Sequence, residues 1–111
     1  MIDNFIENVS DFFKSVWAWV ERIYERILNF FKNIVAWFQD PKRAQLIQKE
    51  KDLIAVSIKE NMASGNVRVI NCLFNTDTEQ VEGEEALGIE SEELDAETKK
   101  HFGGKDMIVL K

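Results

Sequence analysis

The chain repeats residues 11–20, DFFKSVWAWV, as residues 29–38, NFFKNIVAWF. Weaker matches extend the repeat upstream, so that residues 3–20 correspond to residues 21–38. The offset of eighteen residues equals about five whole turns of an α-helix at about 3.6 residues per turn. Each repeated residue therefore returns to the same side of a helix. The repeat predicts one straight helix over residues 1–39, about 58 Å long at about 1.5 Å per residue.

An apolar face runs along the whole of this expected helix. The apolar residues fill close to half of the circumference, which is wider than the stripe of about 100° on an ordinary surface helix. Charged residues such as Asp11, Lys14 and Glu21 fall on the opposite side. We expect the apolar face to contact a membrane or other copies of the chain. The residues expected in this interface are Phe5, Phe12, Phe13, Val16, Trp17, Trp19, Val20, Ile23, Tyr24, Ile27, Phe30, Phe31, Ile34, Trp37 and Phe38.

The same residues also satisfy the heptad pattern of a coiled coil. Leu28 is the only leucine in the segment, however, and leucine is the usual residue of a coiled-coil seam. A two-stranded coil would also leave the flanking aromatic rings in water. A larger bundle, a layer of helices or a lipid surface would cover them.

A second helix is expected over residues 41–63. Asp40 suits the N-cap and Pro41 suits the first turn, while residues 64–66, SGN, close the helix. This helix spans about 34 Å at about 1.5 Å per residue. It is too short to cover the first helix, so Phe5, Phe12, Phe13 and Trp17 would stay exposed. An exposed apolar strip of that size usually marks an interaction surface.

Residues 67–111 are expected to form a small acidic α+β module. Residues 67–74 and 107–110 have the composition of strands, residues 75–90 that of a loop, and residues 91–102 that of a helix with Ser91 as N-cap. Because two strands make a marginal sheet, we expect them to pair with another copy or to lie against the helices. The predicted fold class is mainly α with a small α+β tail. Its three parts are residues 1–39, residues 41–63 and residues 67–111.

The net charge of −6 comes from the C-terminal part of the chain. Through Met62, nine Lys and Arg residues balance nine Asp and Glu residues, whereas the remainder holds five basic and eleven acidic residues. An acidic chain without a basic cluster is a poor binder of nucleic acid, so no nucleic-acid partner is expected. A basic protein partner for the acidic module is a hypothesis that rests on this charge asymmetry alone.

No residue pattern indicates catalysis, a metal or a cofactor. His101 is the only histidine, and its place at the end of a helix explains it. Cys72 lies in an apolar run and is expected to be a buried, inert thiol. Residues 75–82, NTDTEQVE, alternate oxygen ligands but lack the glycine and glutamate of a calcium loop. We therefore expect a protein that is not an enzyme.

Targeting patterns are also missing from the N-terminal segment. Asp3, Glu7, Asp11 and Lys14 interrupt it at every turn, so it holds no uncharged stretch of the roughly 20 residues that a spanning helix needs. It also begins with acidic residues, unlike a signal peptide. The expected location is intracellular or virion-associated, and peripheral to a membrane if the protein binds one.

Two functional hypotheses follow from the apolar face. The first is a peripheral membrane protein that also self-associates, with Phe residues in the lipid and Trp residues at the headgroup level. The second is a soluble, self-assembling structural protein, such as a virion or assembly component, that forms a homo-oligomeric helical bundle or tube. Both predict copies of the same chain as partners.

Overall fold

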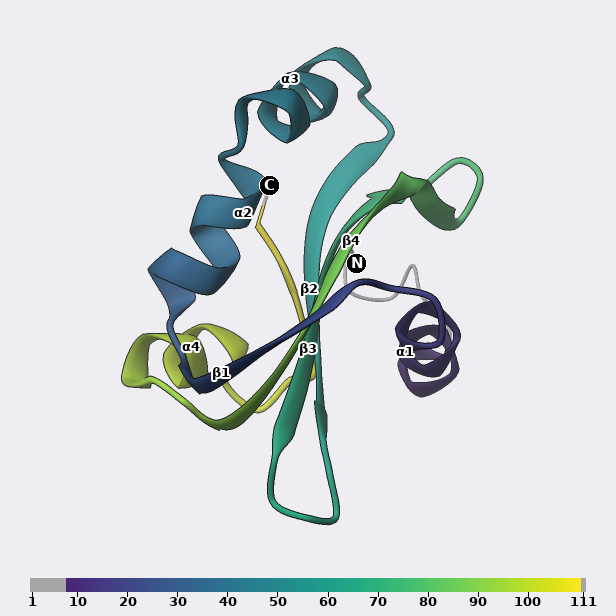
Figure 1. Ribbon diagram of the computed structural model, residues 1–111. Coiled ribbons are helices and arrows are strands. Elements are labelled where there is room, and N and C mark those ends of the chain that lie inside the picture. The colour runs from purple at the N-terminus through teal and green to yellow at the C-terminus, as the bar shows by residue number, and fades with distance from the viewer. Residues whose placement is uncertain (1–7, 111) are drawn as a thin grey trace.

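The computed structural model describes residues 8–110, apart from the side chain of Glu84. Its centre is a five-stranded sheet in the order β1-β4-β3-β2-β5, with helices on both faces (Figure 1). The elements in chain order are α1 (Val9–Trp17), β1 (Arg22–Leu28), η2 (Phe30–Val35), α2 (Ala36–Phe38), α3 (Pro41–Lys49), β2 (Leu53–Asn61), β3 (Val67–Asn75), β4 (Gln80–Leu94), α4 (Ala96–Phe102) and β5 (Met107–Val109). The prediction of a mainly α fold is therefore wrong, and so is the expectation of a helical bundle.

The long N-terminal helix is replaced by a helix, a strand and a second helix. α1 ends at Trp17, and β1 then runs parallel to the second half of β4. β1 is rich in β-branched and aromatic residues, among them Ile23, Tyr24 and Ile27, which suit a strand. The repeat has the period of a helix, but residues 22–28 form a strand because they pair with β4. The repeated residues before Asn8 lie outside the described part of the chain.

The two copies of the repeat form helices on opposite faces of the sheet. α1 packs on the face formed by Ile58, Ile70 and Cys72, here called the first face. The π-helix η2 and the short α2 pack on the second face, which includes Val69 and Ile89. α3 and α4 also lie on the second face, on the other side of the sheet from α1 in Figure 1. The duplicated pattern therefore supplies both layers of the core.

The second helix begins where the sequence predicts but ends early. Asp40 is the N-cap, and its carboxylate accepts a hydrogen bond of 3.0 Å from the backbone N–H of Lys42. The helix stops at Lys49 because Glu50 has extended backbone angles. The expected helical residues 53–61 form β2, a central strand between β3 and β5. The alternation of the pleat buries residues of β2 on both faces, so its apolar run suits a strand covered by helices on both sides.

In the C-terminal part, β3 and β5 confirm the two predicted strands. The expected loop over residues 75–90 is wrong, because residues 80–94 form β4, which pairs antiparallel with β3. The expected helix begins at Ala96 rather than at Ser91, and Asp95 is its N-cap. Ser91 instead lies fully buried in β4. Gly103 ends the helix as expected, with a φ of +59°.

Candidate interaction surface

The described residues of the expected interface are buried, partly buried or exposed in the structure. Most of them form the core: Phe13, Val16, Trp17, Val20, Phe30, Ile34 and Phe38 are buried. Phe12 and Trp37 are partly buried, and Phe5 lies outside the described residues. The sheet therefore covers most of the apolar face that the sequence left without a partner.

Within residues 8–110, five large apolar side chains remain exposed, and all of them come from the expected interface. They are Trp19, Ile23, Tyr24, Ile27 and Phe31, with exposed fractions of 47%, 38%, 56%, 44% and 57%. Three of them belong to β1, and the other two lie on either side of it in the chain. The exposed apolar surface is thus concentrated at one edge of the sheet.

β1 is an edge strand whose outer side has no partner within residues 8–110. The backbone N–H of Gly88 donates a hydrogen bond of 2.8 Å to the carbonyl of Glu21. In a regular ladder, alternate residues point their backbone groups to the same neighbour. Ile23 and Glu25 therefore face β4, while the N–H and C=O groups of Arg22 and Tyr24 point to the open side. We call these groups, together with the five exposed side chains, the β1 edge.

The side chains of β1 alternate between the two faces of the sheet. Arg22 and Gly88 are paired residues and lie on the first face, next to Trp17. A Cβ atom on Gly88 would lie 2.7 Å from Cζ3 of Trp17, so only glycine allows the indole to pack there. Ile23 is paired with the fully buried Ile89 and lies on the second face. Ile23 thus extends a row of core residues to the solvent.

Two carboxylates of β4 on the first face accept hydrogen bonds from neighbouring side chains. Glu90 accepts hydrogen bonds of 3.1 Å from Nδ2 of Asn66 and 3.2 Å from Nε of Arg68, and these bonds hold the pKa of Glu90 below its usual value. The Tyr24 hydroxyl donates to the Glu92 carboxylate, and this hydrogen bond raises the pKa of Tyr24. These contacts leave the Tyr24 ring exposed with its hydroxyl already satisfied.

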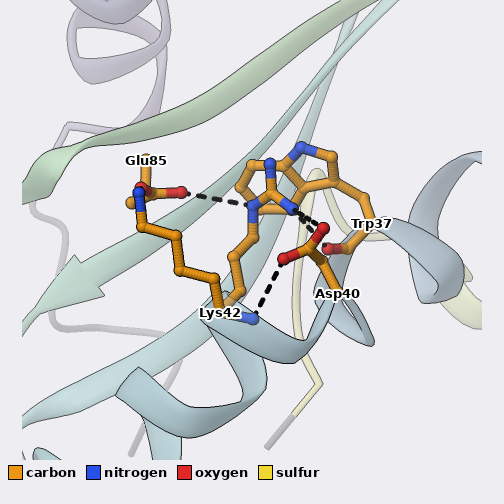
Figure 2. A network of polar contacts seen from close by, with 5 residues as sticks. Trp37, Asp40, Lys42 and Glu85 are labelled. Carbon is orange, nitrogen blue, oxygen red and sulfur yellow. Dashed lines mark hydrogen bonds and ion pairs between the residues drawn. The ribbon is translucent and has the colours of Figure 1, made fainter.

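A second polar cluster ties α3 to β4 (Figure 2). The guanidinium of Arg43 lies 3.9 Å from the centre of the Trp37 ring and donates a hydrogen bond of 3.1 Å to the Trp37 carbonyl. Nε of Arg43 lies 3.3 Å from Glu85, and Nζ of Lys42 lies 3.7 Å from the same carboxylate. These contacts tie α3 to the sheet.

Cys72, His101 and Asp95 each have a structural role in the fold. Cys72 is fully buried under α1, and burial raises its pKa to about 12. His101 stacks on Phe30 at 3.9 Å between ring centres, and its Nε2 lies 3.3 Å from Glu97. Asp95 is N-cap of α4. Burial of the Asp95 carboxyl raises its pKa, but hydrogen bonds from Thr98 and from the backbone N–H of Phe30 have the larger combined effect. The pKa of Asp95 therefore lies below its usual value. Among residues 8–110, no three His, Cys, Asp or Glu side chains gather as metal ligands would.

Two of the hollows in the described part of the chain lie beside α3 and beside α4. An apolar groove of about 490 Å³ lies between α2, α3 and β2, lined by Phe38, Ile47 and Leu110 among others. A polar hollow of about 320 Å³ beside α4 mixes Lys59 and Lys99 with Glu92 and Glu93. Opposite charges line the polar hollow together, so it favours neither an anion nor a cation.

Comparison with known proteins assigns no role to this surface. The chain matches no protein-family model, no curated protein and no solved structure. Across the described residues, every helix is too short or too polar to cross a membrane.

Sequence reasoning found the exposed side chains but missed the open backbone of Arg22 and Tyr24. It treated residues 21–28 as the middle of a helix, where every backbone group is paired internally. The available signal was local: β1 contains three β-branched or aromatic residues and is followed by Asn29, a good N-cap for the next helix. That signal competes directly with the helical period of the repeat.

Proposed function

We propose that this protein is a non-enzymatic, self-associating protein whose copies meet at the β1 edge. The observation that carries the proposal is the combination of an unpaired strand with exposed apolar side chains. Natural proteins usually protect an edge strand by shortening it or by placing charges on it, because an open edge pairs readily with other chains. β1 has seven residues and exposes Ile23, Tyr24 and Ile27, and its charged residues Arg22, Glu25 and Arg26 lie between these apolar side chains or beside them.

The open backbone favours a protein partner over a lipid surface. An unpaired N–H or C=O group costs several kcal/mol in hydrocarbon, where no water is present to bond with it. Arg22 and Tyr24 would bring such groups into the membrane with the apolar side chains. A pairing strand satisfies the same groups and buries the same side chains. The helical face that suggested lipid insertion is also unavailable, because Phe13, Val16 and Trp17 pack in the core.

A second copy of the chain is the partner that the geometry supports best. Two identical edges pair antiparallel about a two-fold axis, and two-fold dimers are the commonest symmetric assemblies of soluble proteins. The basic residues Arg22 and Arg26 are matched by the acidic residues Glu21 and Glu25 in the same segment. The surface is therefore close to neutral, and it would meet its own copy without a large net repulsion at the contact.

Sedimentation velocity over a range of protein concentrations tests this proposal. We expect a monomer–dimer equilibrium without lipid at about 0.15 M salt, where the Debye length of about 8 Å screens the overall negative charge. Because a standard interface buries about 800 Å² on each partner and only one strand of each copy would make this contact, the range should extend to several hundred micromolar. Replacing Tyr24 and Ile27 with Lys should keep the protein monomeric, because the added charges oppose an identical strand.

The matched control replaces Gln45 and Gln48, which are exposed on α3, with Lys. It adds the same charge far from β1 and should dimerise like the natural protein. A parallel arm adds neutral phosphatidylcholine vesicles and measures flotation. A monomer at every concentration, or a monomer that floats with the vesicles, would contradict self-association and assign the exposed side chains elsewhere.

A further inference from the structure

We infer that two copies pair through β1 in one particular register, with Ile23 of one copy directly opposite Ile23 of the other. This inference rests on the proposed self-association and adds the geometry of the contact. When a strand pairs antiparallel with its own copy, one residue lies opposite itself on the two-fold axis. The residues before and after it then lie opposite each other.

The regular part of the β1 edge offers three central residues: Ile23, Tyr24 and Glu25. Beyond Glu25 the ladder with β4 changes, because Arg26 has no paired residue there and the Leu28 carbonyl accepts a hydrogen bond of 2.9 Å from Asp95. Residues on the same face must lie opposite one another, and like charges directly opposite are destabilising. Each of the three registers contains one kind of like-charged pair, so the apolar contacts and the outward backbone groups decide among them.

The two alternative registers use Arg26 as a pairing residue, although the ladder with β4 changes there. With Tyr24 on the axis, Arg22 lies opposite Arg26 twice, and Ile23 lies opposite Glu25. With Glu25 on the axis, two carboxylates meet as a pair without backbone hydrogen bonds between them, where Cα atoms are only about 4.5 Å apart. Neither register brings Ile23 against its own copy.

The register centred on Ile23 joins apolar residues across the two-fold axis. Ile89, Ile23 and their counterparts form one continuous row of four isoleucines on the second face, because Ile23 is already paired with Ile89. On the first face, Arg22 lies opposite the exposed ring of Tyr24 twice, which allows a cation–π contact. Glu21 lies opposite Glu25 twice, two residues from the axis, which is the same spacing as the Arg22–Arg26 pairs of the register centred on Tyr24.

The backbone of the β1 edge fits the same register. Arg22 and Tyr24 are the residues whose N–H and C=O groups point outward, and this register places Arg22 opposite Tyr24. Each Arg22–Tyr24 pair would therefore exchange two backbone hydrogen bonds, as hydrogen-bonded pairs of an antiparallel ladder do. The two Ile23 residues then lie opposite each other between the two Arg22–Tyr24 pairs, without backbone hydrogen bonds of their own. The Cα atoms of such a pair are close enough for a disulfide to join two cysteines there.

Disulfide cross-linking of single-cysteine variants tests the register. Ile23→Cys, Tyr24→Cys and Glu25→Cys each place a thiol at one of the three central positions, and the natural Cys72 stays because its buried thiol does not react. We expect Ile23→Cys to form a covalent dimer under mild oxidation at least ten times faster than the other two variants. Gln45→Cys on α3 measures the background from random collisions, and the natural protein controls for Cys72.

Sedimentation of the same variants under reducing conditions separates the two levels of the hypothesis. If the proteins dimerise but Tyr24→Cys or Glu25→Cys cross-links fastest, the register is wrong and self-association stands. Dimers in which all three variants cross-link no faster than Gln45→Cys also overturn the register. Proteins that stay monomeric at every concentration overturn the proposed function itself.

Discussion

Phe13 and Phe31 occupy the same position in the two copies of the repeat but lie in opposite environments. Phe13 is 1% exposed and stacks on Trp17, whereas Phe31 is 57% exposed. The cause is where each helix begins. Asn8 caps α1, but Asn29, the N-cap of η2, corresponds to Asp11 inside α1. The second helix therefore begins three residues later, and different members of the repeat face the sheet.

This difference predicts unequal effects of one substitution at equivalent positions. Phe13→Ala should lower the free energy of unfolding by about 3–5 kcal/mol, because it leaves a cavity between α1 and the sheet. Phe31→Ala should change it by no more than about 0.5 kcal/mol, since the ring is mostly in water. Urea unfolding of both variants, at a concentration where the protein is monomeric, provides the comparison. Equal losses would contradict the assignment of the two repeats to different environments.

The π-helix η2 is held to the sheet by a buried polar chain. Ala36 N–H donates to the carbonyl of Phe31, five residues back, as a π-helix requires. The carbonyl of Asn33 accepts a hydrogen bond of 2.9 Å from Nδ2 of Asn71 in β3, and Ser57 in β2 donates one of 3.0 Å to Oδ1 of Asn71. Asn71 therefore connects two strands and a helix, and it lies fully buried.

Replacing Asn71 with Leu tests this connection. The change keeps a similar volume but leaves the Asn33 carbonyl and the Ser57 hydroxyl without that partner. We expect a loss of about 1–3 kcal/mol in the free energy of unfolding, the usual cost of a buried polar group left unsatisfied. Ser57→Ala tests one link of the chain alone, and it should also cost about 1–3 kcal/mol because it leaves the buried Oδ1 of Asn71 without a donor. If Asn71→Leu is as stable as the natural protein, the polar chain does not hold η2 in place.

At the level of elements, the sequence reveals helix ends better than strand partners. Asp40 and Pro41 begin α3 and Gly103 ends α4 as predicted, because capping depends on neighbouring residues. β1 and β4 were missed because each is stabilised by a partner far away in the sequence: Tyr24 pairs with Glu90 across β1 and β4. Acidic residues of β4 also resemble a solvated loop until the sheet is known.

At the level of the whole molecule, the two edges of the sheet differ. β5 forms one edge with only three residues, and short edge strands resist pairing. β1 forms the other edge with seven residues and three exposed apolar side chains. The sequence located an apolar surface without a partner but placed it along a helix. The structure confines the exposed part to one edge, and a two-fold dimer there would join the two sheets.

Amide hydrogen exchange of β1, measured by NMR in dilute and concentrated samples, tests the central claim most directly. In the dilute protein, we predict protected amides at Ile23 and Glu25, which face β4, and rapid exchange at Arg22 and Tyr24. Raising the concentration should protect Arg22 and Tyr24 as a second strand pairs with them. Uniform protection from residue 18 to residue 28 in the dilute protein, as in a continuous helix, would contradict the edge strand. Exchange at Arg22 and Tyr24 that stays rapid at every concentration would contradict association through it.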